Sequence, residues 1–354
     1  FSLYLIFYSL VGSIGLFGSE QILIRDSTIN NNRVNVQTKT IKLLFFSSLI
    51  SFLIIPFIFG YFFQKNIIIL ISILFIGNLQ YLIYHTLRIS GNFVEAQLIL
   101  HTPRVVLFLL IFNIERLDSR LILSVENLIV LSLLTITPLI LKSSITISKK
   151  VTLQKEKITH KDIRLNAVFA FSLITLTSIS FIDKFIAEQI DSSSKTLSEF
   201  LLLGTILITP FGFLQNLRNF LLLRNFKLKE NSFLLKKWSI ALSHVLASIT
   251  GFVTFYIYKN YINNKMFDDS INVVWVIIFI TIGVLKLSYA DKSLKFGLEG
   301  QTKSIFFINL YTLIIFVFFT LISFIFNNLT ILIIGNVFSW GYRNYALRDY
   351  VGIK

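Results

Sequence analysis

The chain has 354 residues, of which 55% are hydrophobic and 14% are charged, and this composition excludes an ordinary soluble domain and a disordered segment alike. Its net charge of +15 does not indicate nucleic-acid binding, because the basic residues lie in short connections where membrane orientation and anionic lipids account for them. The sequence has no cysteine for disulfides or thiolate metal sites, and its four histidines are too scattered for zinc, so we expect neither a metal nor a cofactor.

Long apolar runs divide the chain from its first residues to its last. A helix needs roughly 20 residues to cross the bilayer core, and eleven segments are long and apolar enough to do so. They are 1–24, 41–63, 67–87, 93–113, 121–141, 165–187, 197–217, 238–258, 271–290, 304–325 and 328–346. The sequence therefore predicts an all-α polytopic membrane protein.

Lysine and arginine concentrate in every second connection between these segments. Alternate connections carry 25 basic residues on one side and six on the other, when Lys42, Lys286 and Arg343 at the ends of segments are counted with the connections beside them. The remaining two, Arg104 and Lys184, lie inside segments. The rich side is cytoplasmic by the positive-inside rule. This places Phe1 outside and Lys354 inside, and the chain begins with neither methionine nor a cleavable signal pattern. We therefore expect a fragment that lacks one amino-terminal helix, from a protein of twelve helices with both native ends in the cytoplasm.

The longest connection, over 142–164, carries seven basic residues and divides the apolar segments into five before it and six after it. With the missing helix restored, the two halves become two six-helix bundles. We expect an amino-terminal bundle over 1–145, a basic cytoplasmic linker over 146–164 and a carboxy-terminal bundle over 165–354. An even number of helices in each half predicts parallel repeats, related by an axis along the membrane normal.

Ionisable side chains inside apolar segments are the strongest functional signal, since each costs about 2.5–3.5 kcal/mol at a helix centre. Arg104 lies about halfway along 93–113, where it either binds an anion in a central cavity or, if the helix begins later, reaches the cytoplasmic surface. Asp183 and Lys184 are adjacent near the outer end of 165–187 and point about 100° apart. Asp183 is a candidate for a coupling-cation or proton site, and the alternative is an interfacial charge pair.

Two further cations lie near the inner ends of their segments. Arg218 follows 197–217 and Lys286 is in the inner third of 271–290, so each either contacts substrate or extends to the lipid headgroups. Gln21 is one of several polar residues that keep a cavity wet or hydrogen-bond between helices. No acid, base and nucleophile converge in the sequence, so we expect a protein that is not an enzyme.

The glycines of VGSIGLFGSEQ, at three-residue spacing, leave one face of the first apolar segment nearly bare. Such a face allows the backbone of another helix to approach closely. A dinucleotide-binding turn is excluded, because no strand precedes these glycines.

Four motifs, in order along the chain, resemble those of bacterial polysaccharide flippases. SLYLIFYSLVGSIGLFGSEQILIR resembles their second helix, in which a glycine-rich run leads to a cytoplasmic arginine, here Arg25. HTLRISGNFVEAQL is similar to the turn after their fourth helix, SFIDKFIAE to the seventh helix, and LKFGLEGQTK to the turn after the tenth. The resemblance implies the multidrug/oligosaccharidyl-lipid/polysaccharide exporter superfamily, in which two six-helix bundles surround a central cleft that opens alternately to each side.

The same resemblance implies a function. The expected activity moves oligosaccharide repeat units, linked by pyrophosphate to a polyprenyl lipid, from the cytoplasmic to the outer leaflet of the bacterial inner membrane for O-antigen or capsule synthesis. Arginine binds phosphate oxygens through a rigid fork of donors, and Arg104 is the expected head-group ligand. The other expected cavity residues are Arg25, Asp183, Lys184, Arg218, Lys286 and Gln21.

Expected partners are the lipid-linked oligosaccharide, membrane lipids and the polysaccharide polymerase machinery, and no nucleic acid is expected. Two alternatives stay open. One is an ion-coupled multidrug-type exporter of the same superfamily, for which Asp183 would be essential. The less favoured one is a membrane polysaccharide polymerase or ligase, whose families resemble this chain in helix number but carry a large periplasmic loop.

Overall fold

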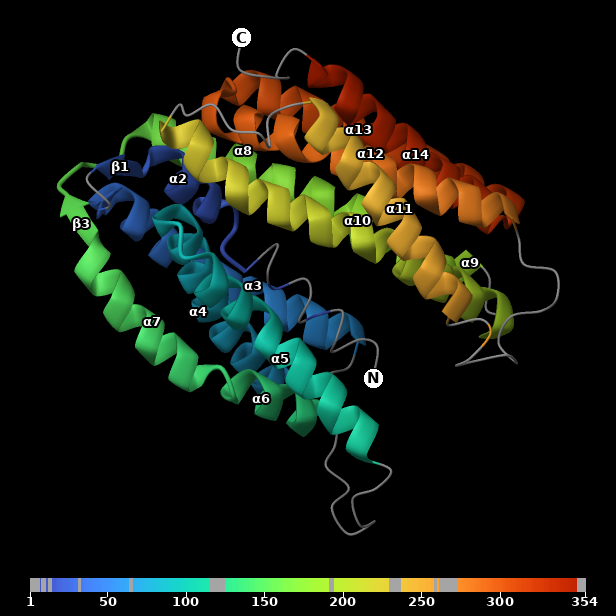
Figure 1. Cartoon of the computed structure of the whole chain (residues 1–354), viewed down its shortest axis with the longest axis horizontal. Helices are drawn as coiled ribbons and strands as arrows, with labels where there is room; N and C mark the ends of the chain where they lie inside the picture. Colours follow the sequence, from blue (N-terminus) through green and yellow to red (C-terminus); the bar gives the residue numbers. More distant parts are fainter. Residues whose placement is uncertain are drawn as a thin grey trace. The chain divides into compact units, whose positions relative to one another are not determined.

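A computed structural model describes residues 7, 11, 15–30, 33–63, 66–114, 125–190, 194–228, 237–257, 260 and 273–348. The chain divides into two compact units, Phe1–Ile174 and Thr175–Lys354. Helices dominate both units (Figure 1).

The described part of the first unit combines helices with three short strands. Its helices are α2 (Ser19–Asp26), α3 (Thr38–Phe63), α4 (Ile67–Ser90), α5 (Phe93–Ile114), α6 (Val125–Leu134), α7 (Thr137–Lys150) and α8 (His160–Thr177), which ends just beyond the unit. Its strands are β1 (Thr28–Asn30), β2 (Arg33–Gln37) and β3 (Val151–Gln154). The break between α6 and α7 falls just before Pro138, which occupies the first turn of α7, where proline is tolerated.

The described part of the second unit is helical throughout. After the last residues of α8 come a π-helix over Ser178–Ile182 and then α9 (Asp183–Ile190), α10 (Ser194–Leu228), α11 (Lys237–Ile257), α12 (Val273–Glu299), α13 (Thr302–Phe326) and α14 (Leu329–Ala346). The π-helix directly precedes Asp183, and such local widenings of a helix are frequent at functional sites.

Eight helices among the described residues are long and apolar enough to cross a membrane. They are Thr38–Tyr61, Ile67–Ser90, Val130–Lys150, His160–Ser180, Leu203–Leu228, Trp238–Ile257, Val273–Glu299 and Thr302–Phe326. Of the other predicted segments, 1–24 lies partly outside the described residues, 93–113 forms α5, and 328–346 forms α14, whose second half is polar. The expected all-α polytopic class is therefore confirmed.

Helix α13 exposes a continuous row of large apolar side chains, here called the α13 apolar row. Its members recur every three or four residues and each is more than a third exposed: Phe307, Tyr311, Ile314, Phe318, Leu321 and Ile325. Soluble proteins rarely expose contiguous apolar patches larger than a few hundred Å². A row that follows the full length of a helix of this kind fits the hydrocarbon of a bilayer.

A three-stranded sheet joins two segments that the sequence analysis placed in separate connections. β1 pairs antiparallel with β2, and β2 pairs parallel with β3, with Val34 opposite Val151 and Gln37 opposite Gln154. Val34 and Val36 alternate with polar residues in β2 and are buried, which gives the short strand one apolar face. Because α3 to α7 separate β2 from β3, the pairing requires both connections to lie on one side of the membrane, as the charge alternation predicts.

Two glycines of the first unit lie where other parts of the chain approach closely, but residues 15–18 form a turn before α2 and not the continuous glycine-lined helix face predicted within 1–24. Ser51 Oγ and Asn78 Nδ2 donate to the carbonyl oxygen of Gly15 at 2.6 and 3.0 Å, so α3 and α4 both reach the backbone there. Gly18 precedes α2 with a φ of 78° and lies against the backbone of α8, where a Cβ would come within 2.5 Å of the Ala170 nitrogen. Only glycine meets both conditions at this position.

The core of the second unit lies where α10, α11 and α12 meet. Phe211, Ala247 and Leu287, one from each helix, are fully buried and in mutual contact. Gly283 of α12 faces the Phe211 ring so closely that a Cβ would overlap it. Beyond this close crossing, Arg218 of α10 and Asp291 of α12 are also in contact.

Candidate functional site

The second half of α14 carries a row of polar side chains on a single helix face. Its members are Asn336, Ser339, Trp340, Arg343 and Asn344, and their spacing of three, one, three and one residues places them on one side of an α-helix. All are at most 9% exposed, because α14 packs against α9, α12 and α13 (Figure 1). We call these residues the α14 polar row. In most amphipathic helices the polar face is exposed, whereas in α14 it is buried.

Arg343 is the largest fully buried side chain of the described structure, at 1% exposure. Its Nη1 donates to Asn309 Oδ1 of α13 at 2.6 Å, and its Nη2 donates to the Tyr289 hydroxyl of α12 at 2.5 Å. The guanidinium carbon also lies 4.9 Å from the centre of the Tyr289 ring. These partners are neutral, and no described carboxylate forms an ion pair with Arg343.

Several atoms of the α14 polar row retain unused hydrogen-bonding capacity. Arg343 Nε, Trp340 Nε1, Ser339 Oγ and Asn336 Oδ1 are buried without a hydrogen-bond partner among the described residues. Each buried polar group left in this condition costs about 1–3 kcal/mol. Lys286 of α12 adds a second cation, with its Nζ 5.2 Å from the centre of the Trp340 ring. The row therefore offers donors and positive charge suited to an anion.

Asp183 lies at the other end of the same row. It is the first residue of α9 and 9% exposed, and Asn336 Nδ2 donates to its Oδ2 at 2.8 Å. Asn336 and Arg343 are seven residues apart, which is roughly 10 Å along the helix axis. A buried carboxylate and a buried guanidinium thus occupy opposite ends of one polar helix face.

The residues predicted from sequence fall into different environments. Lys286 and Asp183 both contact the α14 polar row. Arg218 does not, because α10 continues to Leu228 and Arg218 is 3% exposed inside that helix. There its Nε and Nη2 donate to the two carboxylate oxygens of Asp291 at 3.1 and 2.6 Å, and Nη1 donates to Ser239 at 3.0 Å.

Arg104 and Lys184 can be placed only by their backbones, since their side chains lie outside the described residues. α5 begins at Phe93, so Arg104 is near its middle, directly after Pro103. Lys184 is the second residue of α9. Gln21 and Arg25 belong to α2 and are half-buried.

The sequence analysis missed an acid beside Gln21. Glu20 is 3% exposed in the first turn of α2, and its Oε2 has no hydrogen-bond partner among the described residues. An acid within a predicted membrane segment, two residues after Gly18, is the signal that would have identified it.

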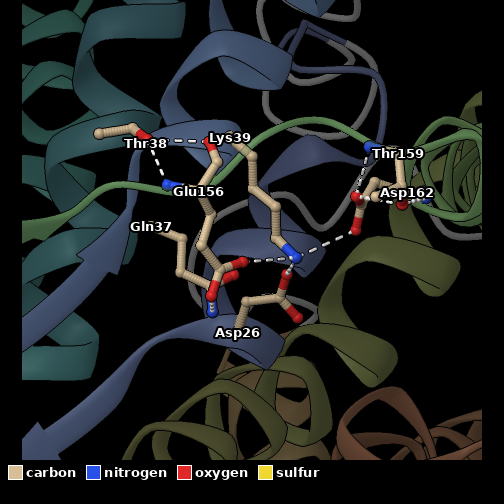
Figure 2. A network of polar contacts seen from close by, with 7 residues as sticks. All are labelled: Asp26, Gln37, Thr38, Lys39, Glu156, Thr159 and Asp162. Carbon is tan, nitrogen blue, oxygen red and sulfur yellow. Dashed lines mark hydrogen bonds and ion pairs between the residues drawn. The ribbon is translucent and has the colours of Figure 1, made fainter.

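In the first unit, three carboxylates surround Lys39, the second residue of α3. Its Nζ lies 3.0 Å from Glu156 Oε2, 3.2 Å from Asp162 Oδ1 and 3.9 Å from Asp26 Oδ2 (Figure 2). We call these four residues the Lys39 network. It connects the end of α2, the segment after β3 and the start of α8.

Polar neighbours hold two of these carboxylates in place. Gln37 Nε2 donates to Glu156 Oε1 at 3.0 Å, and the backbone N–H of Thr159 donates to Asp162 Oδ2 at 2.8 Å (Figure 2). No group of three or more metal-ligating side chains occurs among the described residues. The network is therefore better described as a set of ion pairs that connects three segments of the chain than as a metal site.

Comparison with known proteins returned no match, either to a protein-family model, to a curated protein or to a solved structure.

Proposed function

We propose that this protein moves polyprenyl-pyrophosphate-linked oligosaccharides from the cytoplasmic to the outer leaflet of a bacterial plasma membrane, by alternating access. The observation that carries the proposal is the burial of Arg343 among neutral partners. A buried cation without a counter-charge is costly. An anionic head group that enters and leaves during transport would supply that counter-charge in one state of the cycle.

The donors available at the α14 polar row suit a pyrophosphate. Arg343 Nε and Trp340 Nε1 are buried donors without described partners, and Lys286 lies beside Trp340. Phosphate oxygens accept several charge-assisted hydrogen bonds at once. The neutral Asn309 and Tyr289 hold the guanidinium in position without competing for its charge. Arg104 remains a second proposed head-group ligand, at the middle of α5.

The buried carboxylate of Asp183 adds a proposal for the energy source of transport. Binding of a proton or a cation at Asp183 changes the charge at one end of the α14 polar row. The hydrogen bond from Asn336 would then change strength, since Asn336 donates to the carboxylate. Coupling would follow from the shared helix α14. The same carboxylate favours, as a second candidate, an ion-coupled exporter of cationic compounds.

A transport assay with a fluorescent lipid tests the leading proposal. The native protein would be reconstituted in liposomes with a polyprenyl-pyrophosphate oligosaccharide that carries a fluorophore bleached by membrane-impermeant dithionite. We expect protein-dependent exchange of the lipid between leaflets, and a loss of at least tenfold in rate for Arg343→Gln. Arg348→Gln, on the exposed side of the same region, should keep the wild-type rate. Equal rates for the Arg343 variant and the native protein would contradict the proposal.

A second arm separates the two candidate functions. Export of a cationic dye from the same liposomes, driven by a proton or sodium gradient, would favour the exporter if it requires Asp183 and not Arg343. The flippase proposal expects no dye transport in either gradient.

A further inference from the structure

A groove of about 350 Å³ lies between α13 and α14 in the second unit, separate from the α14 polar row. It is lined by Lys303, Ser304, Phe307, Ile308, Tyr311, Tyr342 and Ala346. Its one charged residue is Lys303, in the first turn of α13, which is exposed and has no described partner. The other lining residues provide three aromatic rings and three hydroxyl groups, those of Ser304, Tyr311 and Tyr342.

The groove continues into the α13 apolar row. Phe307 and Tyr311 line the groove and are also the first two members of that row. Lys303 is four residues before Phe307, so it lies on the same helix face. From Lys303 to Ile325 the helix extends roughly 33 Å, close to the thickness of a bilayer core. One positive charge therefore precedes an unbroken apolar surface along a single helix.

Tyrosine side chains line the groove and its surroundings. The rings of Tyr311 and Tyr342 lie 6.2 Å apart, edge to face, and Tyr345 is exposed nearby with Arg348 over its ring at 4.4 Å. Tyrosine is enriched where the hydrocarbon meets the headgroups. Basic pockets between transmembrane helices at this level bind anionic lipid headgroups.

We propose that this groove is a binding site for an anionic phospholipid. The phosphate pairs with Lys303 and is within the reach of Ser304, and an acyl chain lies along Phe307, Tyr311 and the rest of the α13 apolar row. The distribution of charge and apolar surface matches one lipid molecule, with its head at one end and its tail along the helix. Transport of a lipid-linked substrate is not required for this site.

Native mass spectrometry of the delipidated protein tests the proposal. The protein would be titrated with phosphatidylglycerol, with phosphatidylethanolamine and with inorganic phosphate. We expect a saturable adduct with phosphatidylglycerol, weaker binding of phosphatidylethanolamine, and no displacement of the lipid by phosphate. A single lysine near a headgroup contributes about 1 kcal/mol, so Lys303→Ala should weaken the first adduct about fivefold.

Two further variants control for net charge and for space. Lys149→Ala removes an exposed lysine from the end of α7 and should leave the adduct unchanged. Ala346→Phe fills the groove without a change in charge and should reduce phosphatidylglycerol binding as well. Equal binding of the two phospholipids by the native protein, or an undiminished adduct in both the Lys303 and Ala346 variants, would overturn the site. Displacement of the lipid by phosphate would do the same, because it would show a free-phosphate site.

Discussion

Removal of one partner from the Arg218–Asp291 ion pair should destabilise the second unit more than any change to an exposed charge. Only 4% of the Arg218 side chain and 19% of the Asp291 side chain are exposed. Asp291→Asn keeps the shape of the carboxylate but removes the negative charge that the Arg218 guanidinium faces at 2.6 Å. Such a change costs about 3–5 kcal/mol when the pair is fully buried. The partial exposure of Asp291 places the expected loss near the lower end, at about 3 kcal/mol.

Thermal unfolding in detergent, followed by tryptophan fluorescence, measures this loss. A destabilisation of about 3 kcal/mol corresponds to a fall in Tm of about 6–12 °C for a unit of this size. Glu299→Gln removes an exposed charge from the same helix α12 and should change stability by less than about 0.5 kcal/mol.

A double variant distinguishes loss of the counter-charge from loss of packing. Arg218→Met combined with Asp291→Leu replaces both charges by apolar side chains, which is often neutral for a buried pair. We expect it to recover most of the Tm lost in Asp291→Asn. If Asp291→Asn unfolds within 1 °C of the native protein, Arg218 is solvated at the membrane surface and the reasoning from burial is wrong.

Three further perturbations test other features of the fold and the site. Lys39→Met removes the cation that Asp26, Glu156 and Asp162 share and should cost about 1–2 kcal/mol at low salt, with a smaller difference from the native protein in about 1 M salt, as measured by Tm. Gly18→Ala should cost more than about 1 kcal/mol, because its φ is positive and a backbone faces it, whereas Gly212→Ala meets open space in α10 and should be neutral or stabilising in the same unfolding assay. Asp183→Asn should retain a hydrogen bond to Asn336 and native Tm but abolish the dependence of transport on a proton or sodium gradient, and a gradient response equal to that of the native protein would rule out coupling at Asp183.

Most of the membrane helices could be predicted because each carries its own signal. An apolar run of 20 or more residues can satisfy its backbone in lipid only as a helix, and 41–63 and 304–325 match α3 and α13 to within a few residues. The end of α10 was not predicted, because the prediction followed hydropathy alone. Hydropathy falls after Leu217, but the helix continues to Leu228, so Arg218 lies inside it.

The sites were harder to predict because they depend on distant partners. The Lys39 network joins residues more than a hundred positions apart in the sequence. The strands of the sheet beside it are only three to five residues long. Such short strands have no distinctive sequence pattern. Arg343 was counted with the basic residues of the carboxy-terminal connection, although it lies within 328–346 and the spacing of polar residues there already indicates one polar helix face, which the structure buries.

The parallel pairing of β2 with β3 also constrains how the protein is made. Parallel strands need a long crossover between them, and here that crossover contains α3, α4, α5, α6 and α7. The third strand leaves the ribosome only after all of those helices have been synthesised. Lys39 meets Glu156 and Asp162 later still. During biogenesis, the sheet and the Lys39 ion pairs can therefore form only after residues 151–162 have been synthesised. A nascent chain that ends before residue 151 cannot form these contacts.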